Sequence, residues 1–196
     1  MKTKIVLLNG PPGCGKDTLA DALEMASEDV NRVSFKDPLY DLMCAIYGIK
    51  IGELLSISYD RVLKEQPLSV FGGLSYREAI IKVSEEVIKP NYGEAFFGRS
   101  AAKRIVPGCV NVFSDSGFME EVTPLFKVVP WAEVLLVRIH KRGTFEGDSR
   151  GYLDPNEFHM TVDIDNNNTE AVFIKESFSA IEGLGFLTTG EVNAEG

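Results

Sequence analysis

The chain of 196 residues contains few cysteines, few histidines and a deficit of basic residues. Its three cysteines, Cys14, Cys44 and Cys109, are odd in number and lack the spacing of a metal site. A disulfide framework is therefore not expected, and a reducing compartment fits the composition. The 20 lysines and arginines are outnumbered by 29 acidic residues, which gives a net charge of −9. This balance argues against a nucleic-acid partner, because such proteins present a basic surface.

Long hydrophobic runs are also missing. The apolar run at the N-terminus, Ile5–Leu8, is far too short for a membrane span or for the core of a signal peptide. We therefore expect no membrane partner and a cytoplasmic location. The content of 44% hydrophobic and 25% charged residues is that of an ordinary globular protein, and the length suits one domain with a small inserted lid.

What the chain does contain is a regular alternation of short apolar runs with helical patterns. This alternation predicts an α/β fold, with a central parallel five-stranded sheet and helices on both faces. The predicted strands are Ile5–Leu8, Val30–Phe35, Val110–Phe113, Val134–Ile139 and Met160–Ile164.

Helices are predicted between these strands from their apolar spacing and their caps. Asp37 is expected to cap the second helix, a Ser75–Glu78 capping box to begin the third, and Pro90 to end it. The predicted inward faces include Ile46, Val87 and Val172. The predicted ranges are Lys16–Ala26, Pro38–Tyr47, Ser75–Lys89, Gly93–Val106, Gly117–Val129 and Thr169–Glu182.

The first strand runs directly into Gly10-Pro11-Pro12-Gly13-Cys14-Gly15-Lys16-Asp17-Thr18, which we call the phosphate loop. It fits the pattern GxxxxGK[ST] up to the last position, where Asp17 stands in for Ser or Thr. Glycines let backbone N–H groups converge on an anion, and the following helix directs its positive dipole end to the same point. The strand–loop–helix setting predicts a nucleotide site; the alternative is a glycine-rich turn that binds nothing.

Polar residues also follow the other strands, where ligands gather in an open α/β sheet. Asp115 is expected either to hold Mg²⁺ or to cap a helix. Lys36 could bind a substrate phosphate or be merely solvated, and Arg77 is a candidate for a phosphate contact. The segment His140–Arg150 reads as a lid that brings cations onto a transferring phosphoryl group, or as a plain exposed loop.

Four short stretches of the chain serve as landmarks: Gly15-Lys16-Asp17-Thr18, Ser34-Phe35-Lys36-Asp37-Pro38-Leu39, Ser75-Tyr76-Arg77-Glu78 and Asp115-Ser116-Gly117-Phe118-Met119-Glu120-Glu121. Together they resemble the phage-type deoxynucleoside monophosphate kinases, within the wider P-loop nucleotide kinases. The resemblance extends over most of the chain from Lys4 to about Asn166. One departure stands out, because Gly117 occupies the position where the last landmark usually carries an arginine.

The resemblance implies a three-layer P-loop kinase fold, a single domain over residues 1–187. It would have a substrate-side helical region at about 38–106, a small mobile lid at about 140–155 and a flexible acidic tail at 188–196. The implied reaction is transfer of the γ-phosphoryl group of ATP, with Mg²⁺, to a deoxynucleoside 5′-monophosphate. The implied partners are these small nucleotides, in a host cytoplasm if the protein is of phage origin, and a homodimer is left open.

The resemblance also implies roles for individual residues. The ATP-binding residues would be the loop amides, Lys16 between the β- and γ-phosphates, and Asn166 near the adenine. Asp17 and Asp115 would hold Mg²⁺ directly or through water, with Asp115 counted among the catalytic residues. The remaining assignments are Gly13, Cys14, Gly15, Asp17 and Thr18 for ATP, Lys36, Arg77 and Arg99 for the acceptor, and Lys16, Arg138, Arg142 and Arg150 for catalysis.

Two other functions stay open at this stage. One is a P-loop kinase for another small phosphorylated acceptor, such as phosphomevalonate or a dephospho-coenzyme, because such relatives also use GKD-type loops. The other is a nucleotide-dependent switch or binding module. The chain lacks the Asn-Lys-x-Asp motif that would select guanine, and a basic lid would have no purpose in such a module.

Overall fold

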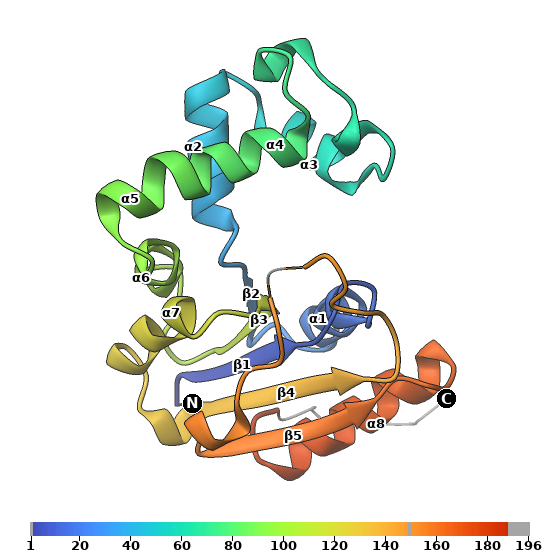
Figure 1. Ribbon diagram of the computed structural model, residues 1–196. Coiled ribbons are helices and arrows are strands. Elements are labelled where there is room, and N and C mark those ends of the chain that lie inside the picture. The colour runs from blue at the N-terminus through green and yellow to red at the C-terminus, as the bar shows by residue number, and fades with distance from the viewer. Residues whose placement is uncertain (1, 149, 188–196) are drawn as a thin grey trace.

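A parallel sheet of five strands forms the centre of the structure, a computed structural model that describes residues 2–148 and 150–187 (Figure 1). The strand order is β2-β3-β1-β4-β5, and every neighbouring pair is parallel. The five predicted strands are confirmed, although β2 is shorter and β3 longer than expected. Their bounds are β1 Lys4–Asn9, β2 Val30–Val33, β3 Val110–Ser116, β4 Val134–His140 and β5 Met160–Asp165.

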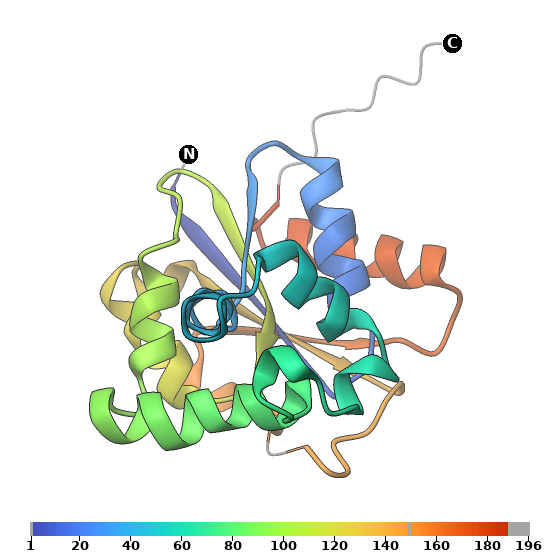
Figure 2. The same cartoon turned by 90° about the horizontal axis from the view of Figure 1, so that it is seen from above.

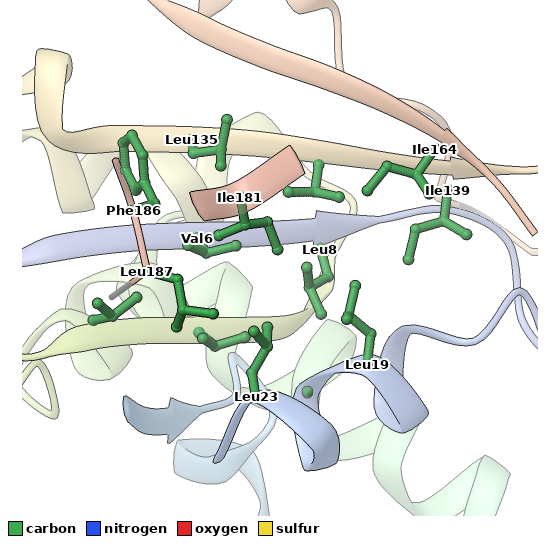
Figure 3. Close-up of a cluster of buried hydrophobic side chains, with 14 of the residues drawn as sticks. Val6, Leu8, Leu19, Leu23, Leu135, Ile139, Ile164, Ile181, Phe186 and Leu187 are labelled. Atoms are coloured by element: carbon green, nitrogen blue, oxygen red, sulfur yellow. The ribbon is translucent and has the colours of Figure 1, made fainter. Parts of the chain in front are cut away.

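Helices cover both faces of this sheet. On one face, α1 (Lys16–Ala26) and α8 (Glu170–Gly183) pack over β1 and β4; Leu23 and Ile181 lie fully buried between them (Figure 3). The other face is covered by α6, α7, η4 with the residues just after it, and the segment around η6. The bounds on this side are α6 Phe96–Ala102, α7 Met119–Val122, η4 Thr123–Lys127, η5 Trp131–Glu133 and η6 Pro155–Glu157.

A helical region, residues 37–92, stands apart from the sheet and carries its own apolar cluster, with Met43, Leu54 and Phe71 at its centre. Figure 2 shows this region seen from above, over the edge at which the strands end. Its elements are α2 Asp37–Tyr47, α3 Ile51–Tyr59, η1 Leu63–Glu65, η2 Ser69–Phe71, α4 Tyr76–Ile81, the π-helical η3 Lys82–Ile88 and α5 Lys89–Tyr92.

Several local predictions are corrected. The helix that begins at the confirmed Ser75–Glu78 capping box does not end at Pro90 but continues to Tyr92. The π-helical stretch before Pro90 explains this, because the N–H of Lys89 pairs with the carbonyl of Ser84 five residues back, and the wider register accommodates a proline.

The second helix begins at Asp37 itself, whose carboxylate accepts the N–H of Ser34 instead of capping the helix. Ile46, Val87 and Val172, predicted to face inward, are 51%, 41% and 39% exposed. The helices predicted at Gly93–Val106 and Gly117–Val129 are shorter, and α3 was not predicted. The last predicted helix is confirmed, with Thr169 as its cap.

Within residues 2–148 and 150–187, no single helix is both long and apolar enough to cross a membrane. Only α2 and α3 taken together reach that length and composition, and they are bent by 115° relative to each other. The tail predicted at 188–196 lies outside the described residues.

Candidate functional site

The phosphate loop turns at two glycines whose backbone other residues rarely adopt. Gly13 has a φ of 77° and Gly15 a φ of 104°. Space around Gly15 is also restricted, because a Cβ atom there would lie 2.7 Å from Nδ2 of Asn166 and 3.1 Å from the ring of Phe173. Gly15 directly precedes α1, so the turn directs the start of that helix toward the loop. The sequence pattern therefore folds as the predicted anion-binding strand–loop–helix unit.

Lys16 lies folded into this loop. Its Nζ donates to the carbonyls of Gly10 (2.6 Å) and Pro11 (2.8 Å), and its side chain is largely buried. Burial lowers the pKa of Lys16, and burial likewise raises the pKa of the neighbouring Cys14 thiol. The Lys16 ammonium thus binds the carbonyl groups of its own loop, and it can exchange these two hydrogen bonds for bonds to phosphate oxygens.

Asn166, which follows β5, lies beneath the loop. Its Nδ2 donates to the carbonyl of Cys14 at 2.9 Å, and its side chain is only 2% exposed. Its Oδ1 is buried and has no hydrogen-bond partner among the described residues. These contacts favour a role in supporting the loop, whereas the sequence reading placed Asn166 near the adenine.

The two candidate magnesium ligands differ in their surroundings. The Asp115 carboxylate, from β3, accepts hydrogen bonds from the Ser34 hydroxyl (2.6 Å) and from the N–H groups of Phe35 (3.0 Å) and Lys36 (3.1 Å). Asp115 is thus neither a helix cap nor free, but fixed at the mouth of the site. Asp17 is exposed and ion-paired with Arg32 of β2 at 2.8 Å.

Magnesium is usually bound through one or two carboxylates, with waters and phosphates completing its shell. Both aspartates line the same cleft, so the chemistry of the donors fits a magnesium-bound nucleotide. In the described part of the chain, no group of three or more His, Cys, Asp or Glu residues gathers as a metal site.

Arg150 occupies the space left by the missing arginine at position 117. A Cβ atom on Gly117 would lie 2.7 to 2.8 Å from the Cβ, Cγ and Cδ atoms of Arg150. The guanidinium forms a two-bond pair with Asp148, at 2.9 Å through Nε and 2.7 Å through Nη2. This pairing raises the pKa of Arg150 and lowers the pKa of Asp148 to about 2. The loop at residues 141–148 and 150–154, which we call the lid loop after the predicted lid, thus places an arginine against Gly117.

A cleft of about 670 Å³ lies between the phosphate loop and the helical region. It brings together most of the predicted site residues at the carboxyl edge of the sheet, as expected for an open α/β sheet. Arg32, Tyr40 and Tyr76, which the sequence analysis did not select, also line it. The predicted residues that line it are Gly13, Gly15, Lys16, Asp17, Thr18, Lys36, Arg77, Asp115 and Arg150.

Three predicted arginines lie elsewhere. Arg138 is paired with Asp163 of the neighbouring strand β5 at 2.8 Å. Arg142 donates to the carbonyl of Asn168, and Arg99 donates to the carbonyl of Tyr92. None of the three lines the cleft in the part of the chain that the structure describes. By strand alternation Arg138 lies on the same face of the sheet as Leu136, where Asp163 is its in-register neighbour on β5.

Lys36 and Arg77, the other predicted acceptor ligands, both line the cleft. Arg77 is ion-paired with Glu65 at 3.0 Å. The Lys36 ammonium has no hydrogen bond or ion pair with any side chain in the described ranges, and is exposed to the cleft. It is therefore a free cation available to an incoming anion.

A second, smaller cavity of about 160 Å³ adjoins the cleft and shares Lys36, Asp115 and Arg150 with it. Glu121 lies on its wall; burial and the nearby Asp115 charge raise the pKa of this carboxyl to about 7. Sequence reasoning named Glu121 only as part of a landmark. The residues next to Glu121 in the sequence do not reveal that Phe35 and Phe97, from distant segments, line the same cavity.

Asn9 is a further residue that the sequence analysis missed. Fully buried at the end of β1, it donates to the carbonyls of Ser116 (2.9 Å) and Gly151 (3.1 Å) and accepts the N–H of Leu153 at 3.0 Å. It ties the base of the lid loop to the sheet. The sequence signal that could have identified Asn9 is its position as a polar residue directly after the apolar run Ile5–Leu8.

No protein-family model matches the chain, and no curated protein sequence matches it. Among solved structures, it is similar to a gluconokinase from Sinorhizobium meliloti 1021, with a TM-score of 0.50, 15% identity, and coverage of 93% of this chain and 92% of that one. A sugar kinase from Janibacter sp. HTCC2649 matches with a TM-score of 0.49 and 12% identity over 95% of this chain and 99% of that one, too distant to add to the argument. The chain therefore shares its α/β fold with that gluconokinase.

Proposed function

We propose that the protein is an ATP-dependent kinase that phosphorylates deoxynucleoside 5′-monophosphates to the diphosphates. The observation that carries the proposal is the shared cleft, in which Lys16 of the phosphate loop and the cations Lys36, Arg77 and Arg150 line one space beside Asp115. A donor triphosphate on the loop and an acceptor monophosphate on the opposite cations would face each other there.

The chemistry required of the protein in such a transfer is positioning and charge neutralisation. Loop amides and Lys16 would hold the donor β- and γ-phosphates. Magnesium, when bound, would neutralise the phosphate charge, with Asp17 and Asp115 as the residues to hold it directly or through water. Arg150 would exchange Asp148 for the transferring group, because a guanidinium binds phosphate by the same two-bond geometry as carboxylate.

The nucleotide nature of the acceptor is supported by the cavity beside the cleft. Three phenylalanine rings line it, and it opens at the cations that would hold the acceptor phosphate. An aromatic chamber suits a flat base. The preference for deoxyribose rests on the resemblance of the four landmarks.

One assay tests the proposal. The purified protein, with ATP and Mg²⁺, is offered each ribo- and deoxynucleoside monophosphate, together with gluconate and phosphomevalonate, and the products are separated by chromatography. Formation of a nucleoside diphosphate from at least one deoxynucleotide is the expected result. Phosphorylation of gluconate or phosphomevalonate alone would overturn the acceptor, and ATP hydrolysis without any phosphorylated product would overturn the kinase.

A further inference from the structure

The second cavity is built differently from the main cleft. Its apolar walls come from three elements that are far apart in the sequence, so only the fold assembles it. It meets the cleft at Lys36, Asp115 and Arg150, so a ligand whose phosphate sits on those cations can extend into it. The remaining residues that line it are Phe35, Leu39, Ser84, Glu85, Lys89, Phe97, Phe118 and Glu121.

Glu121 is the carboxyl of this cavity that has no partner. Its side chain makes no hydrogen bond or ion pair with any residue in the ranges 2–148 and 150–187. The nearest lysine of the wall, Lys89, is already engaged by Glu85 at 2.8 Å and by Glu94 at 3.5 Å, and its Nζ lies 5.5 Å from the centre of the Phe118 ring. The Glu121 side chain is partly exposed on a wall that combines phenylalanine rings with charged residues, so a ligand in the cavity can reach its carboxyl group.

The backbone of Glu121 is held in place by the helix next to it. Gly98 of α6 approaches so closely that a Cβ atom there would overlap the carbonyl of Glu121. The N–H of Glu121 is bonded to the carbonyl of Phe118. The backbone of Glu121 is therefore fixed by packing, and its side chain lies on the wall of the cavity.

We propose that the acceptor's heteroaromatic ring enters the second cavity and that Glu121 holds the polar edge of that ring, as a specificity-determining residue. The proposal deepens the proposed function and rests on it. A protonated carboxyl offers one donor and one acceptor side by side, the pattern that a base edge needs.

The protonation of Glu121 is set by the groups that face it. Asp115 on β3 favours its neutral form, as do the apolar walls, and Glu85 on η3 lies on the same wall. Lys89 on α5, Arg150 on the lid loop and Lys36 favour its charged form. The acceptor's phosphate would neutralise Lys36 and Arg150, so binding shifts Glu121 further toward the neutral, donating form.

The test compares the pH dependence of the acceptor Michaelis constant in wild type, Glu121→Gln and Glu121→Ala, with exposed Glu120→Gln as matched control. The wild-type constant should rise above pH 7, up to tenfold per pH unit. Glu121→Gln keeps a donor and an acceptor without titrating, so its profile should be flat there, and Glu121→Ala should raise the constant roughly tenfold at every pH. Because the acceptor phosphate also ionises near pH 6 in all variants, the ratio of wild type to Glu121→Gln isolates the carboxyl.

Identical pH profiles in wild type and Glu121→Gln, or an effect on the Michaelis constant of ATP alone, would overturn the inference. If wild type phosphorylates no monophosphate, the proposed function fails instead, and calorimetric titration with deoxynucleoside monophosphates at pH 6 and pH 8 still decides the role of Glu121. Weaker binding at pH 8 than at pH 6 in wild type but not in Glu121→Gln supports that role. The same change of affinity with pH in the two proteins overturns it.

Discussion

The contact between Gly117 and Arg150 makes the most specific prediction about this molecule. A methyl group at position 117 would lie 2.7 to 2.8 Å from three carbon atoms of the arginine stem, so the two cannot coexist without movement. Overpacking of this kind costs about 1–3 kcal/mol. We expect Gly117→Ala to lower the free energy of unfolding by about 1–2 kcal/mol, because the lid loop can relax part of the clash.

We expect Gly117→Ala to affect the rate of phosphoryl transfer more than the free energy of unfolding. Displacing the Arg150 stem moves its guanidinium away from both cavities, so the rate of phosphoryl transfer should fall about tenfold to a hundredfold. Urea unfolding followed by circular dichroism measures the first effect, and steady-state kinetics measures the second. Gly151→Ala is the matched control, since Gly151 lies in the same loop and a Cβ atom there would meet nothing within 4 Å.

A double-mutant cycle separates this contact from general damage. With Arg150→Gly in place, which removes the Cβ, Cγ and Cδ atoms, the methyl group of Gly117→Ala has space, and its effect on stability should shrink to within about 0.5 kcal/mol of zero. The coupling between the two positions should then be about 1–2 kcal/mol. Additive effects in the cycle would show that the arginine does not lie on Gly117 in solution.

Three further changes probe the site. Lys16→Ala should lower the turnover number about 10²- to 10³-fold through lost charge stabilisation, with an unchanged circular dichroism spectrum. The control Lys103→Ala, at an exposed lysine, should match wild type. Near-normal turnover of Lys16→Ala would contradict the proposed mechanism. Arg77→Ala should chiefly raise the acceptor's Michaelis constant in the same assay, and an effect on ATP alone would reverse the assignment of donor and acceptor sides. The folded-state pKa of Glu121 is raised from 4.5 to about 7, so the stability that this carboxyl contributes in acid is lost as the pH rises through 7. Urea unfolding should show the free energy of unfolding of wild type falling, relative to Glu121→Gln, by at most about 3 kcal/mol between pH 4.5 and pH 8. A difference between the two proteins that stays constant with pH would contradict the shift.

Much of the candidate site could be predicted from short stretches of sequence. The phosphate loop combines glycines and a lysine within nine residues after an apolar strand, and each of these acts through its own backbone or its immediate neighbours. Lys36 and Asp115 could be found because Lys36 follows β2 and Asp115 lies at the end of β3, and strand ends of a parallel sheet meet at one edge. Local pattern therefore located the main cleft.

Helix faces were predicted less well where neighbours are missing. Val87 and Val172 have the spacing of inward residues, but no element covers them, and they remain about 40% exposed. The continuation of the helix through Pro90 depends on a shift of the backbone register upstream, which residue type alone does not reveal. Periodicity gives the direction of a side chain on its helix, not what lies opposite.

The sequence by itself determined the alternating strands and helices, the phosphate loop and the edge of the sheet where ligands gather, because these follow from neighbours along the chain. Only the tertiary structure decided which arginine reaches the site: Arg138 pairs with Asp163 on β5, while Arg150 lies on Gly117, 33 positions earlier in the chain. It also decided that Glu121, which has no hydrogen bond or ion pair among the described residues, shares a cavity with phenylalanine rings from distant segments. The physical reason is that burial, pairing and pKa depend on groups brought together across the fold, whose distances no local pattern contains.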